Sequence, residues 1–170
     1  MDSNDDKATV AGGVKNLRVE VKRVVNAPIA RVWSAITRAD EVRQWWAAGE
    51  VEAREGGRIK LEGGDDCGPD ALPLDGRVKV FLPPHVFEFT WNEASDPAMG
   101  LVRFDLVELD EHTTLVTLVN TVPAGDLIAA AIGWHVLMDR LRDQAVRGEV
   151  GPAPDEARMQ ELHALYAGSD

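Results

Sequence analysis

The sequence predicts an α+β fold in which a curved, seven-stranded antiparallel sheet wraps around one long C-terminal helix. Strand-like segments alternate apolar and polar residues, as in "LRVEVKRVV" from residue 17, a pattern typical of a strand with one wet face. The turns between most of these segments are short and rich in Gly, Asp and Pro, which favours antiparallel neighbours. Only the segment from Asp126 to about Arg147 carries apolar residues at helical spacing over a length that could cover such a sheet.

Two short helices are expected between the first and the second strand. The first strand ends at "NAP", because Pro28 cannot donate a hydrogen bond to a sheet but suits the first turn of a helix. Apolar residues then recur at helical spacing from Ile29 to Ile36. A second short helix is expected from about Asp40 to Trp46, with Asp40 as its N-cap.

Six further strands are expected between residue 50 and the long helix. Each is bounded by a Gly-, Asp- or Pro-rich turn, and "ELDEHTTL" predicts a tight hairpin between the last two. In chain order the six segments are "EVEAR", "GRIKLE", "GRVKVFLPP", "HVFEFTW", "GLVRFDLVELD" and "TTLVTLVNTV".

A last helix is expected from about residue 155 to 167. It presents Met159, Leu162 and Tyr166 on one side, and this stripe either packs on its own chain or forms a homodimer contact. The expected organisation is a disordered leader over residues 1–15, one domain over residues 16–148, and a tail helix over residues 149–170 that packs on the domain.

Composition excludes several classes of protein. A chain of 170 residues with 45% apolar residues can bury a sizeable core. Its 18 basic and 29 acidic residues give a net charge of -11, which argues against nucleic acid or an anionic membrane as the main partner. No apolar run is long enough for a membrane span. The single cysteine, Cys67, excludes an intramolecular disulfide, and we expect a cytoplasmic protein.

An apolar cavity is expected between the sheet and the long helix, because a strongly curved sheet touches a single helix closely along only part of its width. Inward-facing residues would line this cavity and bind a hydrophobic or aromatic small molecule; the alternative for each aromatic is simple core packing. The candidate lining residues are Trp45, Trp46, Phe87, Phe89, Trp91, Phe104, Trp134, His135 and Met138.

The aromatic candidates do not all carry the same expectation. Trp45 and Trp46 are adjacent on one helix and cannot both point inward, so one is expected inside and the other at the rim or surface. Trp33 is expected to hold its helix against the sheet instead of contacting ligand. His135 follows Trp134 by about 100° around the helix and is expected at the edge of the cavity.

No metal, cofactor or catalytic constellation is expected. Cys67 lies among aspartates in a loop whose spacing fits neither a zinc nor a calcium site, and no phosphate-binding glycine motif is present. His135, Glu88 and Asp105 are the only candidates for an acid or base. Arg103 is expected on the wet face of its strand, or in the pocket if a bulge changes the register.

An ordered set of segments resembles a known family. These are "APIARVWSAIT", the tryptophan pair after it, "EGGRIK", "GRVKVFLPPHVFEFTW" and "GWHVLMDRL". Together they resemble the activator-of-heat-shock-ATPase homologue family, within the START-like, helix-grip (SRPBCC) superfamily. The resemblance covers residues 17 to 147 and implies a helix-grip fold that encloses a hydrophobic cavity.

Three functions follow as expectations. The first is non-catalytic binding of a lipid-like or polyketide-like molecule between the sheet and the long helix. The second, implied by the resemblance alone, is a co-chaperone domain that stimulates the heat-shock chaperone ATPase, although the leader is too short for the additional N-terminal domain of the better-known members. The third is a polyketide cyclase or aromatase, which would require a buried polar cluster in the cavity.

Overall fold

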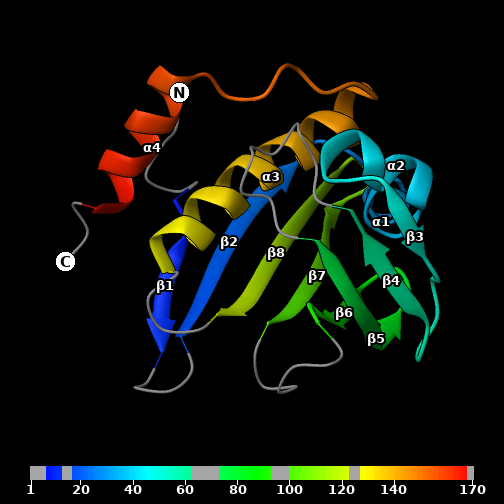
Figure 1. Cartoon of the computed structure of the whole chain (residues 1–170). Helices are drawn as coiled ribbons and strands as arrows, with labels where there is room; N and C mark the ends of the chain where they lie inside the picture. Colours follow the sequence, from blue (N-terminus) through cyan, green and yellow to red (C-terminus); the bar gives the residue numbers. More distant parts are fainter. Residues whose placement is uncertain (1–6, 13–16, 63–72, 93–99, 123–126, 168–170) are drawn as a thin grey trace.

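The computed structural model describes residues 7–12, 17–62, 73–92, 100–122 and 127–167. Within this part of the chain, eight strands form one antiparallel sheet in the order β1-β2-β8-β7-β6-β5-β4-β3 (Figure 1). The strands are β1 (Thr9–Gly12), β2 (Leu17–Val25), β3 (Gly49–Val51), β4 (Arg58–Leu61), β5 (Leu74–Leu82), β6 (Val86–Thr90), β7 (Leu101–Asp110) and β8 (Thr113–Val122).

Four helices accompany the sheet in the described residues: α1 (Ile29–Thr37), α2 (Ala39–Trp45), α3 (Leu127–Arg147) and α4 (Glu156–Ala167). The sheet curves around α3, and α1 and α2 lie beside the C-terminal half of α3 (Figure 1). This arrangement confirms the predicted α+β fold, with a curved antiparallel sheet around a long helix and two short helices between the first two predicted strands.

The first strand of the structure was not anticipated. The expectation of a disordered leader over residues 1–15 is wrong for Thr9–Gly12, which form β1 and pair antiparallel with β2. The free backbone N–H and C=O groups at the edge of β2 form hydrogen bonds with "TVAG". This strand therefore forms without the alternation of apolar and polar residues that identifies the other strands. Tyr166 of α4 contributes as well, because its hydroxyl accepts a 2.8 Å hydrogen bond from the backbone N–H of Ala8.

The helix α4 packs on α3. Leu162 and Tyr166 are buried there, whereas Met159 of the same predicted stripe is 40% exposed.

In the described residues, no helix is both long and apolar enough to cross a membrane.

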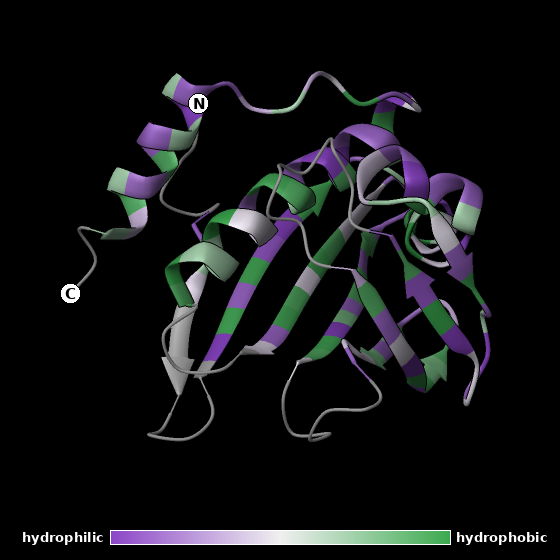
Figure 2. Cartoon of the chain, in the orientation of Figure 1, coloured by the Kyte–Doolittle hydropathy of each residue, from purple (hydrophilic) through white to green (hydrophobic). Residues whose placement is uncertain are grey.

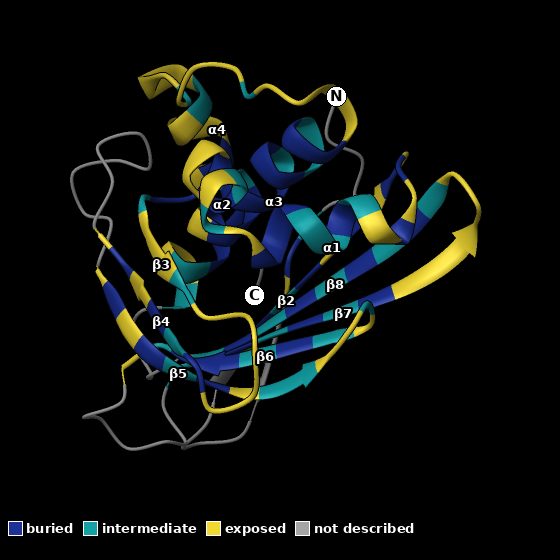
Figure 3. Ribbon diagram, turned by 90° about the vertical axis from the view of Figure 1, so that its right-hand side faces the viewer, coloured by how far each residue is buried: buried dark blue, intermediate teal, exposed yellow. Residues whose placement is uncertain are grey.

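One face of the sheet is buried and the other faces solvent. Hydropathy alternates along the strands in Figure 2, and Figure 3 shows the helices gathered on one side with the β7–β8 hairpin end exposed. Val102 and Phe104 face inward and are buried, as the alternation predicts. Helix α3 lies over this buried face, so the inner face and α3 together bound the interior of the fold.

Arg103 lies on the outer face of β7. Its Nε donates to Asp105 at 2.8 Å and its Nη1 to Glu88 at 3.3 Å. The hydrogen bonds to Asp105 raise the pKa of the Arg103 guanidinium, with a further contribution from Glu88. The irregularity in the β7–β8 pairing falls at Glu108, beyond Arg103, so the register at Arg103 is regular and the wet-face alternative is the one observed.

Candidate functional site

All nine tryptophan and phenylalanine side chains of the chain form one connected set of ring contacts. We call this set the aromatic cluster. It joins residues of α1, α2, the β5–β7 region of the sheet and α3, with ring centroids 5.1 to 6.5 Å apart, the range in which aromatic pairs attract. Its members are Trp33, Trp45, Trp46, Phe81, Phe87, Phe89, Trp91, Phe104 and Trp134.

Trp46 contacts more members of the cluster than any other ring. Its centroid lies 5.2 Å from that of Trp134, 5.5 Å from Trp45, 6.0 Å from Trp91 and 6.1 Å from Phe89. These partners come from α2, from α3 and from the C-terminal end of β6 with the residue that follows it. Trp46 therefore fills the space between the sheet and α3.

The prediction that only one of Trp45 and Trp46 points inward is wrong. Both are buried, at 1% and 9% exposure. The rotation of 100° per residue does not hold across this pair, because α2 ends at Trp45 and Trp46 has φ -122° and ψ -84°. The Trp45 indole is also held from the other side, since its Nε1 donates a 2.8 Å hydrogen bond to the carbonyl of Ala35 in α1.

The two ends of the aromatic cluster are half-buried. Trp33 marks one end, where its ring lies 5.4 Å from Phe81 on β5. Trp91 marks the other end and lies against Trp46 and Trp134. Gly100, with φ +81°, permits this placement, because a Cβ there would lie 2.8 Å from the Cβ of Trp91.

Asn120 is a polar member of the interior that the sequence reasoning missed. Its Oδ1 accepts a 2.9 Å hydrogen bond from Trp134 Nε1, and its Nδ2 donates to the carbonyls of Leu101 and Thr121. The signal was present, because in "TTLVTLVNTV" the alternation that places Val116 inward also places Asn120 inward. Asn120 fixes the Trp134 indole within an otherwise apolar surface.

His135 does not lie at the edge of this cluster as expected. It is fully buried on the other side of α3, where its Nδ1 is 2.8 Å from the hydroxyl of Tyr166 in α4. Because Trp134 faces the sheet interior, the helical rotation turns His135 toward α4. Met138, one turn after Trp134, is buried in the core.

A buried ionic network surrounds His135. Arg23 of β2 has a fully buried side chain whose Nε donates to Asp139 Oδ1 at 2.9 Å. Asp139 also accepts from Arg142 at 3.1 Å, and its Oδ2 lies 3.6 Å from His135 Nε2. Arg23 was not among the predicted site residues, although the alternation that buries Val19 and Val21 also places Arg23 inward.

The candidate acids and bases are not gathered at the aromatic cluster. Glu88 and Asp105 pair with Arg103 on the outer face, and His135 faces α4. No three His, Cys, Asp or Glu side chains of the described residues are arranged to hold a metal ion. Cys67 and its neighbouring aspartates lie outside the described residues.

The fold and its interior define a class of protein. A curved antiparallel sheet closed by a long C-terminal helix over an aromatic interior is a helix-grip domain of the START-like type. More specifically, the profile of the Activator of Hsp90 ATPase homolog 1-like protein family matches residues 26–145, and the chain belongs to this family. No curated protein sequence matches the chain.

Solved structures support the same fold. A conserved protein of unknown function from Enterococcus faecalis has 18% identity and a TM-score of 0.75, covering 96% of this chain and 90% of that one. CalU16 from Micromonospora echinospora has 22% identity and a TM-score of 0.72, with 94% and 96% covered. The Aha1 dimer from Colwellia psychrerythraea has 18% identity and a TM-score of 0.64, with 77% and 97% covered. Identities this low indicate a shared fold.

Proposed function

We propose that the protein binds a hydrophobic or aromatic small molecule, without chemical change, against the Trp46, Trp91 and Trp134 end of the aromatic cluster. The observation that carries the proposal is that all nine Trp and Phe rings form one connected set of contacts, which reaches the half-buried Trp91 beside Trp46 and Trp134 of α3. These rings contact one another without a break inside a core that also contains aliphatic side chains, and the set ends on a half-buried tryptophan at each end.

The Trp91 end is the better candidate for ligand contact. Its three indoles come from three separate places in the chain: directly after α2, directly after β6, and within α3. Their centroids are 5.2, 6.0 and 6.4 Å apart. The Trp91 indole Nε1 donates a 3.2 Å hydrogen bond to the carbonyl of Pro73, and the ring is only half-buried, so part of it faces solvent. A flat ligand that takes the place of solvent on this ring gains about 25 cal/mol for each Å² of apolar surface removed from water.

The binding test compares two half-buried tryptophans at opposite ends of the cluster. Naphthalene, 9,10-anthraquinone and palmitate serve as probes, followed by tryptophan fluorescence and isothermal titration calorimetry. We expect at least one probe to bind, and Trp91→Leu to weaken its affinity by about ten-fold, since a lost aromatic contact costs about 0.5–1.5 kcal/mol beyond its area.

Trp33→Leu is the matched control. It removes an indole of similar exposure that contacts Phe81 and Phe87, far along the cluster from Trp91, and should leave affinity unchanged. The proposal fails if no probe alters the fluorescence, or if the two variants weaken binding equally.

Family membership favours a second candidate function, stimulation of an Hsp90-type chaperone ATPase. We expect ATP turnover by a purified Hsp90 to rise when the protein is added in excess. The rise should survive Trp91→Leu, because a docking surface for a chaperone would be on the outside of the fold. Unchanged turnover at saturating protein would remove this candidate and leave the ligand-binding proposal standing.

A further inference from the structure

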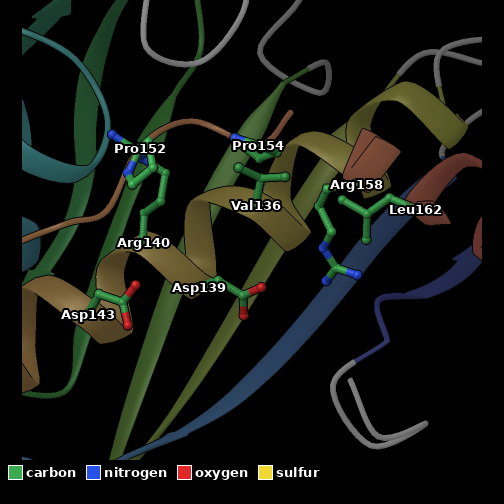
Figure 4. Close-up of a pocket in the computed structure, with 8 residues that line it drawn as sticks. All are labelled: Val136, Asp139, Arg140, Asp143, Pro152, Pro154, Arg158 and Leu162. Carbon is green, nitrogen blue, oxygen red and sulfur yellow. The ribbon is translucent and has the colours of Figure 1, made fainter. Parts of the chain in front are cut away.

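A pocket of about 220 Å³ lies on the side of α3 away from the aromatic cluster (Figure 4). This volume is several times the roughly 30 Å³ that one water molecule takes up in the liquid. Its apolar walls are Val136 of α3, Pro152 and Pro154 of the connecting segment, and Leu162 of α4. The family match ends at residue 145, so three of these four side chains lie outside the matched region.

Arg140 extends from α3 toward Pro152 in this pocket (Figure 4). The residue is 8% exposed, and its Nε and Nη1 donate to the carbonyls of Trp45 at 3.1 Å and Gly151 at 3.3 Å. Both acceptors are neutral, and no carboxylate of the described residues forms an ion pair with Arg140. A buried guanidinium without an anion is costly, and a carboxylate is the group that its geometry fits best.

Asp143 lines the same pocket less than one turn further along α3. Among the described residues, no hydrogen bond or ion pair reaches its carboxylate. Asp139, one turn earlier, differs in this respect, because Arg23 and Arg142 both donate to it. Asp139 also lines the pocket, but its carboxylate is already paired, so the pocket offers a ligand Arg140 without a counter-ion and Asp143 without a partner among the described residues, beside an apolar wall.

We propose that this pocket binds a small zwitterion with an aliphatic side chain, of the chemical class of the aliphatic α-amino acids. The ligand carboxylate pairs with Arg140, its ammonium group pairs with Asp143, and its side chain packs on Val136 and Leu162. Each charged group of the ligand then supplies what the protein group lacks. Arg158 of α4 also lines the pocket, and although its Nη1 pairs with Glu161 at 3.2 Å, its positive charge adds attraction for the carboxylate end.

The test uses three molecules that differ only in their charged groups, titrated calorimetrically into the full chain. L-leucine carries both groups, 4-methylpentanoate lacks the ammonium, and 3-methylbutylamine lacks the carboxylate. We expect L-leucine to bind at least about ten-fold more tightly than either analogue, which corresponds to about 1.4 kcal/mol. Equal affinities for the three, or no binding of L-leucine at millimolar concentration, would overturn the proposal.

Variants locate the site. Asp143→Asn should abolish the preference for L-leucine over 4-methylpentanoate. It should preserve folding, because no described residue is bonded to the Asp143 carboxylate. Arg140→Gln should remove binding of the two ligands that carry a carboxylate, L-leucine and 4-methylpentanoate. If this variant unfolds because it loses the hydrogen bond to the Trp45 carbonyl, the Asp143→Asn variant alone tests the site. Glu149→Gln, which removes an exposed acid of the same segment outside the pocket, should change nothing. An unchanged preference in Asp143→Asn would refute the assignment.

Discussion

Replacing Asp139 by alanine is expected to lower the free energy of unfolding by about 3 kcal/mol. The reason is Arg23, whose side chain is fully buried and whose Nε donates to Asp139 at 2.9 Å. Arg23 also donates to the backbone carbonyls of Lys22 and His135, but these acceptors carry no charge and cannot replace the carboxylate of Asp139. The expected loss lies at the lower end for a broken buried pair, because the Asp139 side chain is 28% exposed.

Urea-induced unfolding followed by circular dichroism measures this loss, and a thermal scan should show a melting temperature lower by about 6–12 °C. Asp143→Ala is the matched control, because it removes the same carboxylate one turn along the same helix where no described residue is bonded to it. Its effect should stay within about 0.5 kcal/mol. Equal losses in the two variants would show that the pairing with Arg23 contributes nothing specific.

The double variant Arg23→Met with Asp139→Ala separates pairing from burial. Replacing a buried ion pair by apolar groups is far less costly than removing one partner, because no charge is left in the interior. The double variant should therefore be more stable than Asp139→Ala alone. Additive losses would instead mean that the two side chains act independently.

The alternation of apolar and polar residues predicted the strands, but it did not predict the contacts of the polar residues that face inward. The pattern that identified β2 also places Arg23 inward, and the pattern of β8 places Asn120 inward. What the pattern does not contain is the partner, since Asp139 is 116 residues from Arg23 and the pairing depends on how α3 crosses the sheet. Inward polar positions were thus predictable from the sequence, whereas their contacts were not.

The sequence predicts which aromatic residues belong to the aromatic cluster better than it predicts how their rings are arranged. Alternation places Phe87 and Phe89 on one face, and helical spacing places Trp134 toward the sheet. The burial of both Trp45 and Trp46 depends on where α2 ends, and local pattern locates helix ends poorly. Thr9–Gly12 form a strand because β2 offers an edge, which is a tertiary effect with little trace in four residues.

Trp46→Ala is expected to lower the free energy of unfolding by about 3–5 kcal/mol, the usual cost of removing a large buried aromatic side chain. Trp46 contacts four other rings, so its loss leaves an apolar cavity bounded by Trp45, Phe89, Trp91 and Trp134. Urea titration measures the loss. A loss below about 1 kcal/mol would mean that the neighbouring rings collapse into the space.

The same variant should be rescued by a small aromatic molecule, because a dry apolar cavity of this kind binds ligands of matching shape. Indole at about one hundred times its dissociation constant would restore about 2.7 kcal/mol of stability. Trp33→Ala is the control, since Trp33 is half-buried at the far end of the cluster and its removal opens a site to solvent instead of enclosing one. Stabilisation of Trp46→Ala by indole, without stabilisation of Trp33→Ala, would show that the interior between the sheet and α3 accepts an aromatic guest. Equal responses of the two variants would show that indole binds elsewhere, and the aromatic cluster would then be core packing alone.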